Sequence, residues 1–88
     1  MPDITPTAAG QDLTSTDGKR DAHIRIEEQE YVPGTKGTMI CVDVFDSSVF
    51  DPNEAHMDSF CTPWGNLGAG EMTDFLKGYG FNVTVRFG

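Results

Sequence analysis

The strongest hydrophobic pattern of the chain lies in residues 37–46, where apolar side chains occupy both odd and even positions. β-branched and aromatic residues are typical of strands. Because successive strand side chains point to opposite faces, a segment that is apolar at both parities is covered on both sides and lies inside a sheet. We therefore expect a central strand with a helix over one face. One face would carry Thr38, Ile40, Val42 and Val44, and the other Met39, Cys41 and Phe45.

Three further segments have strand character. Residues 22–32 alternate between apolar and polar positions and lead through the turn-forming residues 33–37 into the central strand, which predicts an antiparallel hairpin. Residues 55–61 are a third possible strand. Residues 81–87 alternate most clearly, and as the last segment they predict an edge strand through which the protein could oligomerise.

One segment has the period of a helix, because Met72, Phe75, Leu76 and Tyr79 follow one another at the spacing i, i+3, i+4 and i+7. The glycine-rich residues 65–70 predict a flexible loop before it. The fold class is therefore α+β, a small antiparallel sheet of three to five strands packed by one helix.

The first 21 residues contain few large apolar groups. Such a segment buries too little surface to offset the entropy of ordering it. We therefore expect a flexible N-terminal arm over residues 1–21 and a single domain over residues 22–88.

The charge is unevenly distributed along the chain. The net charge is -8, and no lysine or arginine lies between Lys36 and Lys77. This balance argues against a general phosphate-binding surface and favours a partner protein with a basic surface. A purely solubilising role for these carboxylates stays open. The candidate partner-binding residues are Asp43, Asp46, Asp51, Glu54 and Asp58.

Two cysteines, Cys41 and Cys61, are too few for a disulfide framework, and both have apolar neighbours in the sequence. Buried free thiols in a reducing cytosol are the expectation. The N-terminus lacks the pattern of a signal peptide, and no apolar run is long enough to span a membrane. We expect a cytoplasmic protein without membrane contact.

The chain contains no catalytic signature. Cys41, His56, Cys61 and Asp58 are the only candidate zinc ligands, and their spacing matches no common zinc motif. Cys61 with His56 lacks an orienting third residue for nucleophilic catalysis. We therefore predict no enzymatic activity, no metal and no cofactor.

The order of the elements resembles that of small phage proteins encoded near recombination and single-strand-binding genes. The resemblance covers about two thirds of the chain, including the Gly34-Thr35-Lys36-Gly37 turn and a helix that ends in Leu76-Lys77-Gly78-Tyr79-Gly80. It implies an OB-like barrel that binds single-stranded DNA. The implied DNA-binding residues are Arg25, Tyr31, Lys36 and Arg86.

In composition the chain is also similar to acidic phage inhibitors of host defence, including anti-CRISPR and nucleic-acid-mimic proteins. This similarity implies an inhibitor that docks on the basic surface of a nucleic-acid-handling protein. It is the leading hypothesis, with the single-stranded DNA-binding accessory protein as the first alternative. The second alternative is a virion or assembly component in which the arm over residues 1–21 lies along a neighbouring subunit.

Overall fold

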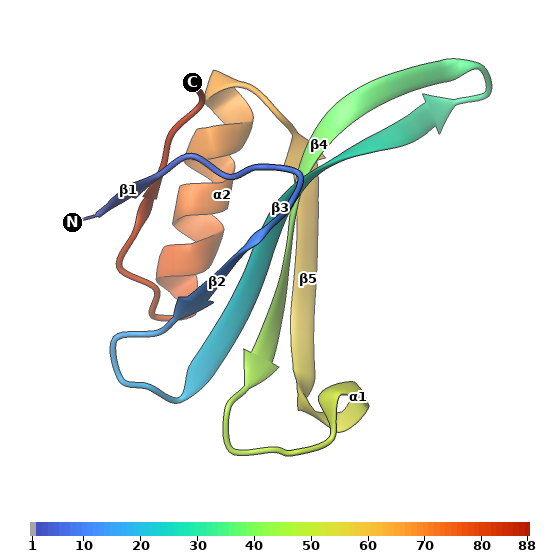
Figure 1. Cartoon of the computed structure of the whole chain (residues 1–88). Helices are drawn as coiled ribbons and strands as arrows, with labels where there is room; N and C mark the ends of the chain where they lie inside the picture. Colours follow the sequence, from blue (N-terminus) through green and yellow to red (C-terminus); the bar gives the residue numbers. More distant parts are fainter. Residues whose placement is uncertain (1) are drawn as a thin grey trace.

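A computed structural model describes residues 2–88, apart from the side chain of Tyr31, and shows a sheet with helices and short strands around it (Figure 1). The elements in chain order are β1 (Asp3–Ile4), β2 (Gln11–Thr14), β3 (Arg20–Val32), β4 (Thr35–Asp46), α1 (Pro52–Ala55), β5 (His56–Pro63), α2 (Asn66–Gly78) and β6 (Thr84–Val85).

Four strands form an antiparallel sheet in the order β2-β3-β4-β5, so β4 lies inside the sheet as the sequence predicts. The α+β class with a small antiparallel sheet is confirmed. β2 and β5 lie at opposite edges, which leaves the sheet open. The OB-like barrel implied by the family resemblance is therefore wrong for the described residues, because closure of a barrel requires the edge strands to pair.

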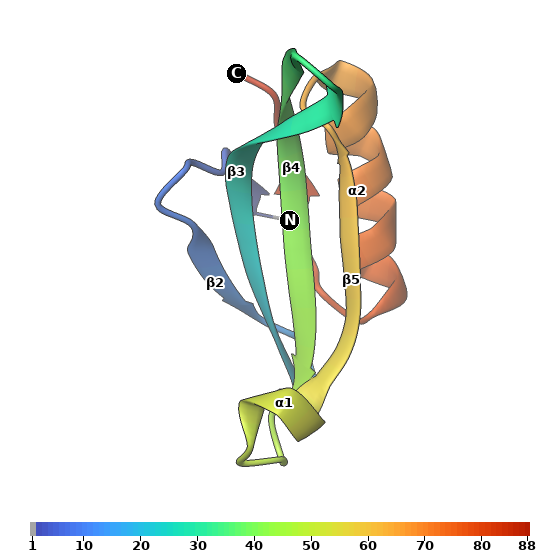
Figure 2. The ribbon, with the colours of Figure 1, turned by 90° about the vertical axis from the view of Figure 1, so that its right-hand side faces the viewer.

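One face of the sheet is covered by α2 and by the two-stranded parallel pair of β1 and β6 (Figure 2). The apolar stripe of α2 packs on the even positions of β4, as predicted. The central side chains of this core are no more than 1% exposed: Ile40, Val42, Val44, Met72, Leu76 and Phe81. The opposite face of the sheet, which we call the open face, has no helix or strand of residues 2–88 over it.

The start of α2 differs from the predicted loop at residues 65–70, because the helix already begins at Asn66. A Cβ atom on Gly68 would lie 1.9 Å from the carbonyl oxygen of Pro63. Glycine at this position therefore lets the first turn of the helix approach the end of β5 closely. Of the glycines that indicated flexibility in the sequence, Gly68 and Gly70 are part of the helix and Gly65 is its N-cap residue.

The segment expected as a flexible arm over residues 1–21 is instead part of the domain. β2 pairs with β3, with Leu13 opposite Ala22 and both side chains buried, and β1 pairs with β6. These strands have only two and four residues, which is too short to give a hydrophobic period. The predicted boundary at residue 22 is therefore wrong, and a free arm is not available to lie along a neighbouring subunit.

The C-terminal strand is shorter than predicted and is not a free edge. Its regular part covers only Thr84 and Val85. The backbone N–H groups of residues 84 and 86 donate to the carbonyls of Pro2 and Ile4, and that of residue 85 donates to the hydroxyl of Thr73. Oligomerisation by sheet extension at β6 would have to displace these bonds.

Candidate functional site

The two cysteines form a disulfide across the sheet, which contradicts the expectation of free thiols. Cys41 on β4 lies directly opposite Cys61 on β5, with a Cα–Cα distance of 4.1 Å. The sequence does not reveal this register, because a loop and a short helix separate the two strands. Disulfides persist mainly in oxidising compartments. A cytoplasmic location therefore loses the support it had from free thiols and stays a prediction.

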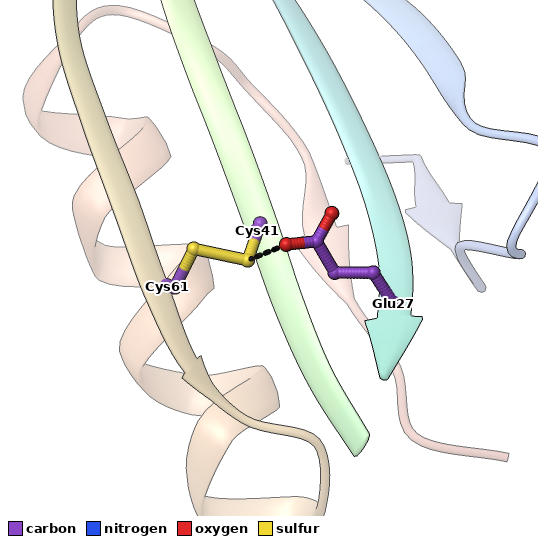
Figure 3. Close-up of side chains that lie close together, drawn as sticks. All are labelled: Glu27, Cys41 and Cys61. Carbon is purple, nitrogen blue, oxygen red and sulfur yellow. Dashed lines mark hydrogen bonds between the residues drawn. A yellow bond between two sulfur atoms is a disulfide. The ribbon is translucent and has the colours of Figure 1, made fainter. Parts of the chain in front are cut away.

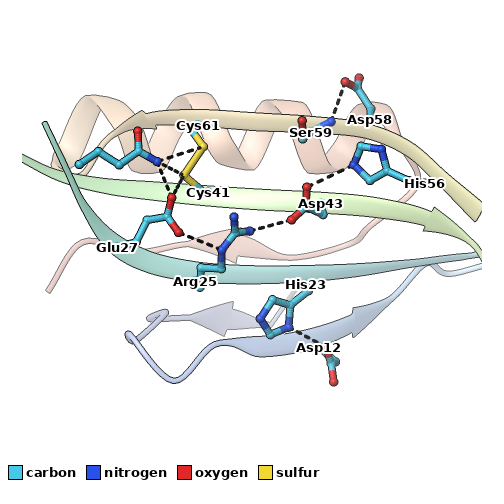
Figure 4. A network of polar contacts seen from close by, with 11 residues as sticks. Asp12, His23, Arg25, Glu27, Cys41, Asp43, His56, Asp58, Ser59 and Cys61 are labelled. Carbon is cyan, nitrogen blue, oxygen red and sulfur yellow. Dashed lines mark hydrogen bonds and ion pairs between the residues drawn. A yellow bond between two sulfur atoms is a disulfide. The ribbon is translucent and has the colours of Figure 1, made fainter. Parts of the chain in front are cut away.

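Around the disulfide, the open face carries a network of charged side chains (Figure 4). The Arg25 guanidinium donates to Glu27 at 3.2 Å and to Asp43 at 2.9 Å. His56 Nε2 lies 3.2 Å from the second oxygen of Asp43. At the β2 edge, a separate contact of 2.9 Å joins His23 to Asp12. Asp43 is thus occupied within the chain.

A carboxylate and an amide lie against the disulfide itself, and Figure 3 shows the carboxylate, which belongs to Glu27. Glu27 Oε1 is 3.4 Å from Cys41 Sγ, and the Gln29 amide nitrogen is 3.5 Å from Cys41 Sγ and 4.0 Å from Cys61 Sγ. Gln29 also donates to Glu27 Oε1. Among the described residues, Glu27 is the acidic side chain that lies close to both cysteines. The two other candidate ligands considered from the sequence, His56 and Asp58, are not part of this group.

Glu27 could not be selected from the sequence, because its place depends on strand register. Arg25 lies opposite Cys41, so Glu27, two residues further along β3, is the diagonal neighbour of Cys41 on the same face. Its position in the alternating pattern of residues 22–32 was the only available signal. That pattern places Glu27 on the polar side but gives no partner strand.

The five predicted partner-binding carboxylates do not converge on one surface. Asp43 belongs to the open face, whereas Asp58 lies across from Val44 and so has the opposite parity. Asp58 accepts hydrogen bonds from the Tyr79 hydroxyl at 2.6 Å and from the Ser59 N–H at 2.8 Å. These two carboxylates serve contacts within the fold on opposite sides of the sheet.

The other three carboxylates lie in residues 46–55, which comprise the last residue of β4 and its connection to β5 and which we call the acidic loop. Asp46 accepts from the Ser48 hydroxyl at 2.7 Å and from its N–H at 2.9 Å, and these bonds lower the pKa of Asp46. Asp51 caps α1 by accepting from the Asn53 N–H at 2.9 Å. Glu54 is exposed in the same helix. Local hydrogen bonds therefore fix two of the three carboxylates.

Phe50 is the residue that sequence reasoning missed in this loop. It is 102% exposed, more than any other large apolar side chain described. The adjacent turn between β2 and β3 supplies Lys19, and β3 begins with Arg20. Both residues line an open pocket with Asp46 and Met57. The same turn and the start of β3 also carry Asp17 and Asp21. This end of the molecule thus combines one exposed aromatic ring with an excess of negative charge.

The residues implied for DNA binding lie in separate parts of the fold. Arg25 is held by carboxylates of the open face, and Arg86 follows β6 and lies 3.3 Å from Asp3. Lys36 lies on the hairpin of β3 and β4. The side chain of Tyr31 lies outside the described residues. The three described cations therefore do not line a common groove.

The contact between Tyr79 and Asp58 predicts a measurable pH dependence. The hydrogen bond from Tyr79 is the largest cause that lowers the pKa of Asp58. A carboxyl with a lowered folded-state pKa stabilises the fold above its unfolded pKa, and this stabilisation is lost as the pH falls through the folded value. Tyr79→Phe should therefore lower the free energy of unfolding at neutral pH, and the difference should vanish in strong acid. Urea unfolding at both pH values measures this; an equal loss at both would contradict it.

Comparison with protein-family models, with curated proteins and with solved structures finds no match. Neither helix of the described residues has the length and apolar character needed to cross a membrane.

Proposed function

We propose that this chain is a non-enzymatic protein-binding module that docks through its acidic loop onto a basic protein surface. The observation that carries the proposal is the complete exposure of Phe50 among carboxylates. An aromatic ring buries a large area on binding, and such residues commonly dominate the energy of an interface. A ring that contributes nothing to the core of its own fold is free to contribute to that of a complex.

The charges around Phe50 indicate the chemistry of the partner. This end of the molecule carries five acidic and two basic residues. The acidic residues are Asp17, Asp21, Asp46, Asp51 and Glu54, and the basic residues are Lys19 and Arg20. A negative rim around an apolar anchor complements a basic rim around an apolar pocket. Lys19 also allows an acidic group of the partner to be accommodated at the neighbouring pocket, whereas the Arg20 guanidinium is held within the fold, where it donates to the Tyr79 carbonyl at 3.2 Å.

Basic protein surfaces of this kind commonly bind nucleic acid, so the partner we propose is a nucleic-acid-handling protein. The chain would act as an inhibitor or a nucleic-acid mimic, in line with its compositional similarity to phage inhibitors of host defence. The side-chain bonds of Asp46 and Asp51 support this role. Carboxylates held by local hydrogen bonds lose little entropy when they replace phosphates in a basic channel.

Capture from cell lysate tests the proposal. The intact chain, Phe50→Ala and Leu67→Ala are immobilised separately. Leu67 is the matched control, because it is 86% exposed and lies on α2 rather than in the acidic loop. A partner should bind the wild-type chain and Leu67→Ala, and Phe50→Ala should weaken binding by about 2 kcal/mol, or roughly thirtyfold.

Adding salt or heparin to the captured complex tests the chemistry of the partner's surface. Raising the salt concentration should release it, because the attraction between the rims is screened. Heparin, a polyanion without bases, should compete with the chain for the basic surface. Equal capture by Phe50→Ala, or retention in heparin and high salt, would contradict the proposal. Direct retardation of a labelled single-stranded oligonucleotide by the purified chain would favour the DNA-binding alternative.

A further inference from the structure

We propose that reduction of the Cys41–Cys61 disulfide creates a zinc site whose third protein ligand is Glu27. The site lies on the open face, where its residues come from β3, β4 and β5 (Figure 4). It is independent of the proposed function, because none of its ligands belongs to the loop. The inference rests on the geometry of the three side chains, on the charges around them and on access from solvent.

The three candidate ligand groups are already gathered in one place on the open face. One sulfur of each cysteine and one oxygen of Glu27 all lie within 4.8 Å of one another. With ordinary zinc–sulfur and zinc–oxygen bond lengths, tetrahedral geometry separates a sulfur from an oxygen ligand by about 3.6 Å. Glu27 Oε1 and Cys41 Sγ are 3.4 Å apart, so the carboxylate needs almost no movement.

The two sulfur atoms must separate to about 3.8 Å to share one zinc ion. Cys41 and Cys61 face each other directly on paired strands, so rotation of the two side chains after reduction provides this distance. The backbone register is held by β4 and β5 and does not have to change. The fourth tetrahedral position is left to water at the exposed Cys61 side of the site.

Outer contacts orient the carboxylate toward the sulfur atoms. Arg25 holds Glu27 through Oε2, which leaves Oε1 directed at Cys41. Hydrogen-bonded second-sphere partners of this type fix a ligating carboxylate. Two thiolates and one carboxylate exceed the charge of Zn²⁺ by one, and the Arg25 guanidinium, which also pairs with Asp43 at 2.9 Å, offsets part of this excess.

The chemistry requires a thiol reductant of the kind found in cells. Its thiolate attacks the exposed Cys61 sulfur, the bond between Cys61 and Cys41 breaks, and Cys41 leaves as a thiolate. A second reductant thiol then attacks the mixed disulfide, which frees Cys61 and forms the oxidised reductant. Zn²⁺ replaces the thiol protons, which pass to solvent. Thiolate ligands favour zinc over magnesium or calcium. Exchange with the oxidised, disulfide form of the reductant runs the same steps in reverse: it re-forms the Cys41–Cys61 bond, returns two thiols to the reductant, removes two of the three ligands and releases the metal.

Metal titration of the full chain in both redox states tests the inference. The chain is reduced with a phosphine and titrated with Co²⁺, which reports thiolate ligation by charge-transfer absorption, and with Zn²⁺ against a chromophoric chelator. We expect one ion per reduced chain and none per oxidised chain. Glu27→Gln should weaken zinc binding at least tenfold, whereas Glu28→Gln should not change it. Glu28 is the matched control, since it is bonded to Thr38 and is adjacent to Glu27 in β3.

Folding must be followed in the same samples, because the reduced chain loses a cross-link. Zinc should raise the melting temperature of the reduced chain, or refold it where reduction has unfolded it. Circular dichroism with and without zinc measures this. The inference is overturned when the reduced chain binds no zinc at micromolar concentration, when Glu27→Gln binds as tightly as wild type, or when zinc binds without stabilising the fold.

Discussion

Phe81→Ala should lower the free energy of unfolding by about 3–5 kcal/mol, the range for removal of a buried phenylalanine ring. Phe81 is 1% exposed and is the largest of the fully buried side chains. It follows α2 directly, and its ring joins the C-terminal segment to the core of the sheet and helix. A domain of this size has a total stability on the order of 4–13 kcal/mol, so the variant should lose a large fraction of its stability.

Phe87→Ala is the matched control for this prediction. Phe87 lies in the same C-terminal segment but is 48% exposed, with an edge contact to Trp64. Phe87→Ala should lower the free energy of unfolding by about 1 kcal/mol or less. Urea unfolding followed by circular dichroism compares the two variants. Similar losses would mean that the C-terminal segment is not packed as described.

The double variant Cys41→Ser, Cys61→Ser should melt at a much lower temperature than the oxidised wild-type chain. The bridge closes a loop with a sequence separation of 20 residues. Loop-closure entropy then gives a stabilisation of about 3 kcal/mol. For a domain of this size, such a loss lowers the melting temperature by roughly 12–24 °C.

The reductant supplies the control for this second prediction. A phosphine should lower the melting temperature of the metal-free wild-type chain and leave that of the double variant unchanged. Equal melting temperatures for the variant and the untreated wild-type chain would contradict a stabilising bridge. Alkylation of both cysteines in the untreated chain would show that the bridge is absent.

The sequence was sufficient to predict the parts of the fold that depend on long local patterns. The two-sided apolar pattern of residues 37–46 placed β4 inside the sheet, and the stripe from Met72 to Tyr79 placed α2 on one face. Both patterns extend over enough residues to show their period. β1 and β2 show no such period, because they have only two and four residues. Their positions in the fold are set by pairing with distant segments.

The site was less predictable, because it depends on contacts between strands. The disulfide and the position of Glu27 both follow from the register of β3, β4 and β5, which no local pattern specifies. The uneven distribution of acidic residues was visible in the sequence, but Asp43 and Asp58 lie on opposite faces of the sheet. The exposure of Phe50 could not be read from the sequence either, because an aromatic residue in a loop is equally compatible with a place in the core.

The most direct test of docking through the acidic loop is competition on the captured partner. The partner is first bound to a fluorescent single-stranded oligonucleotide, and the chain is then added while fluorescence anisotropy is recorded. We predict that the wild-type chain and Leu67→Ala release the oligonucleotide, and that Phe50→Ala requires roughly thirtyfold higher concentration. Release by Phe50→Ala at the wild-type concentration, or simultaneous binding of chain and oligonucleotide, would contradict the account.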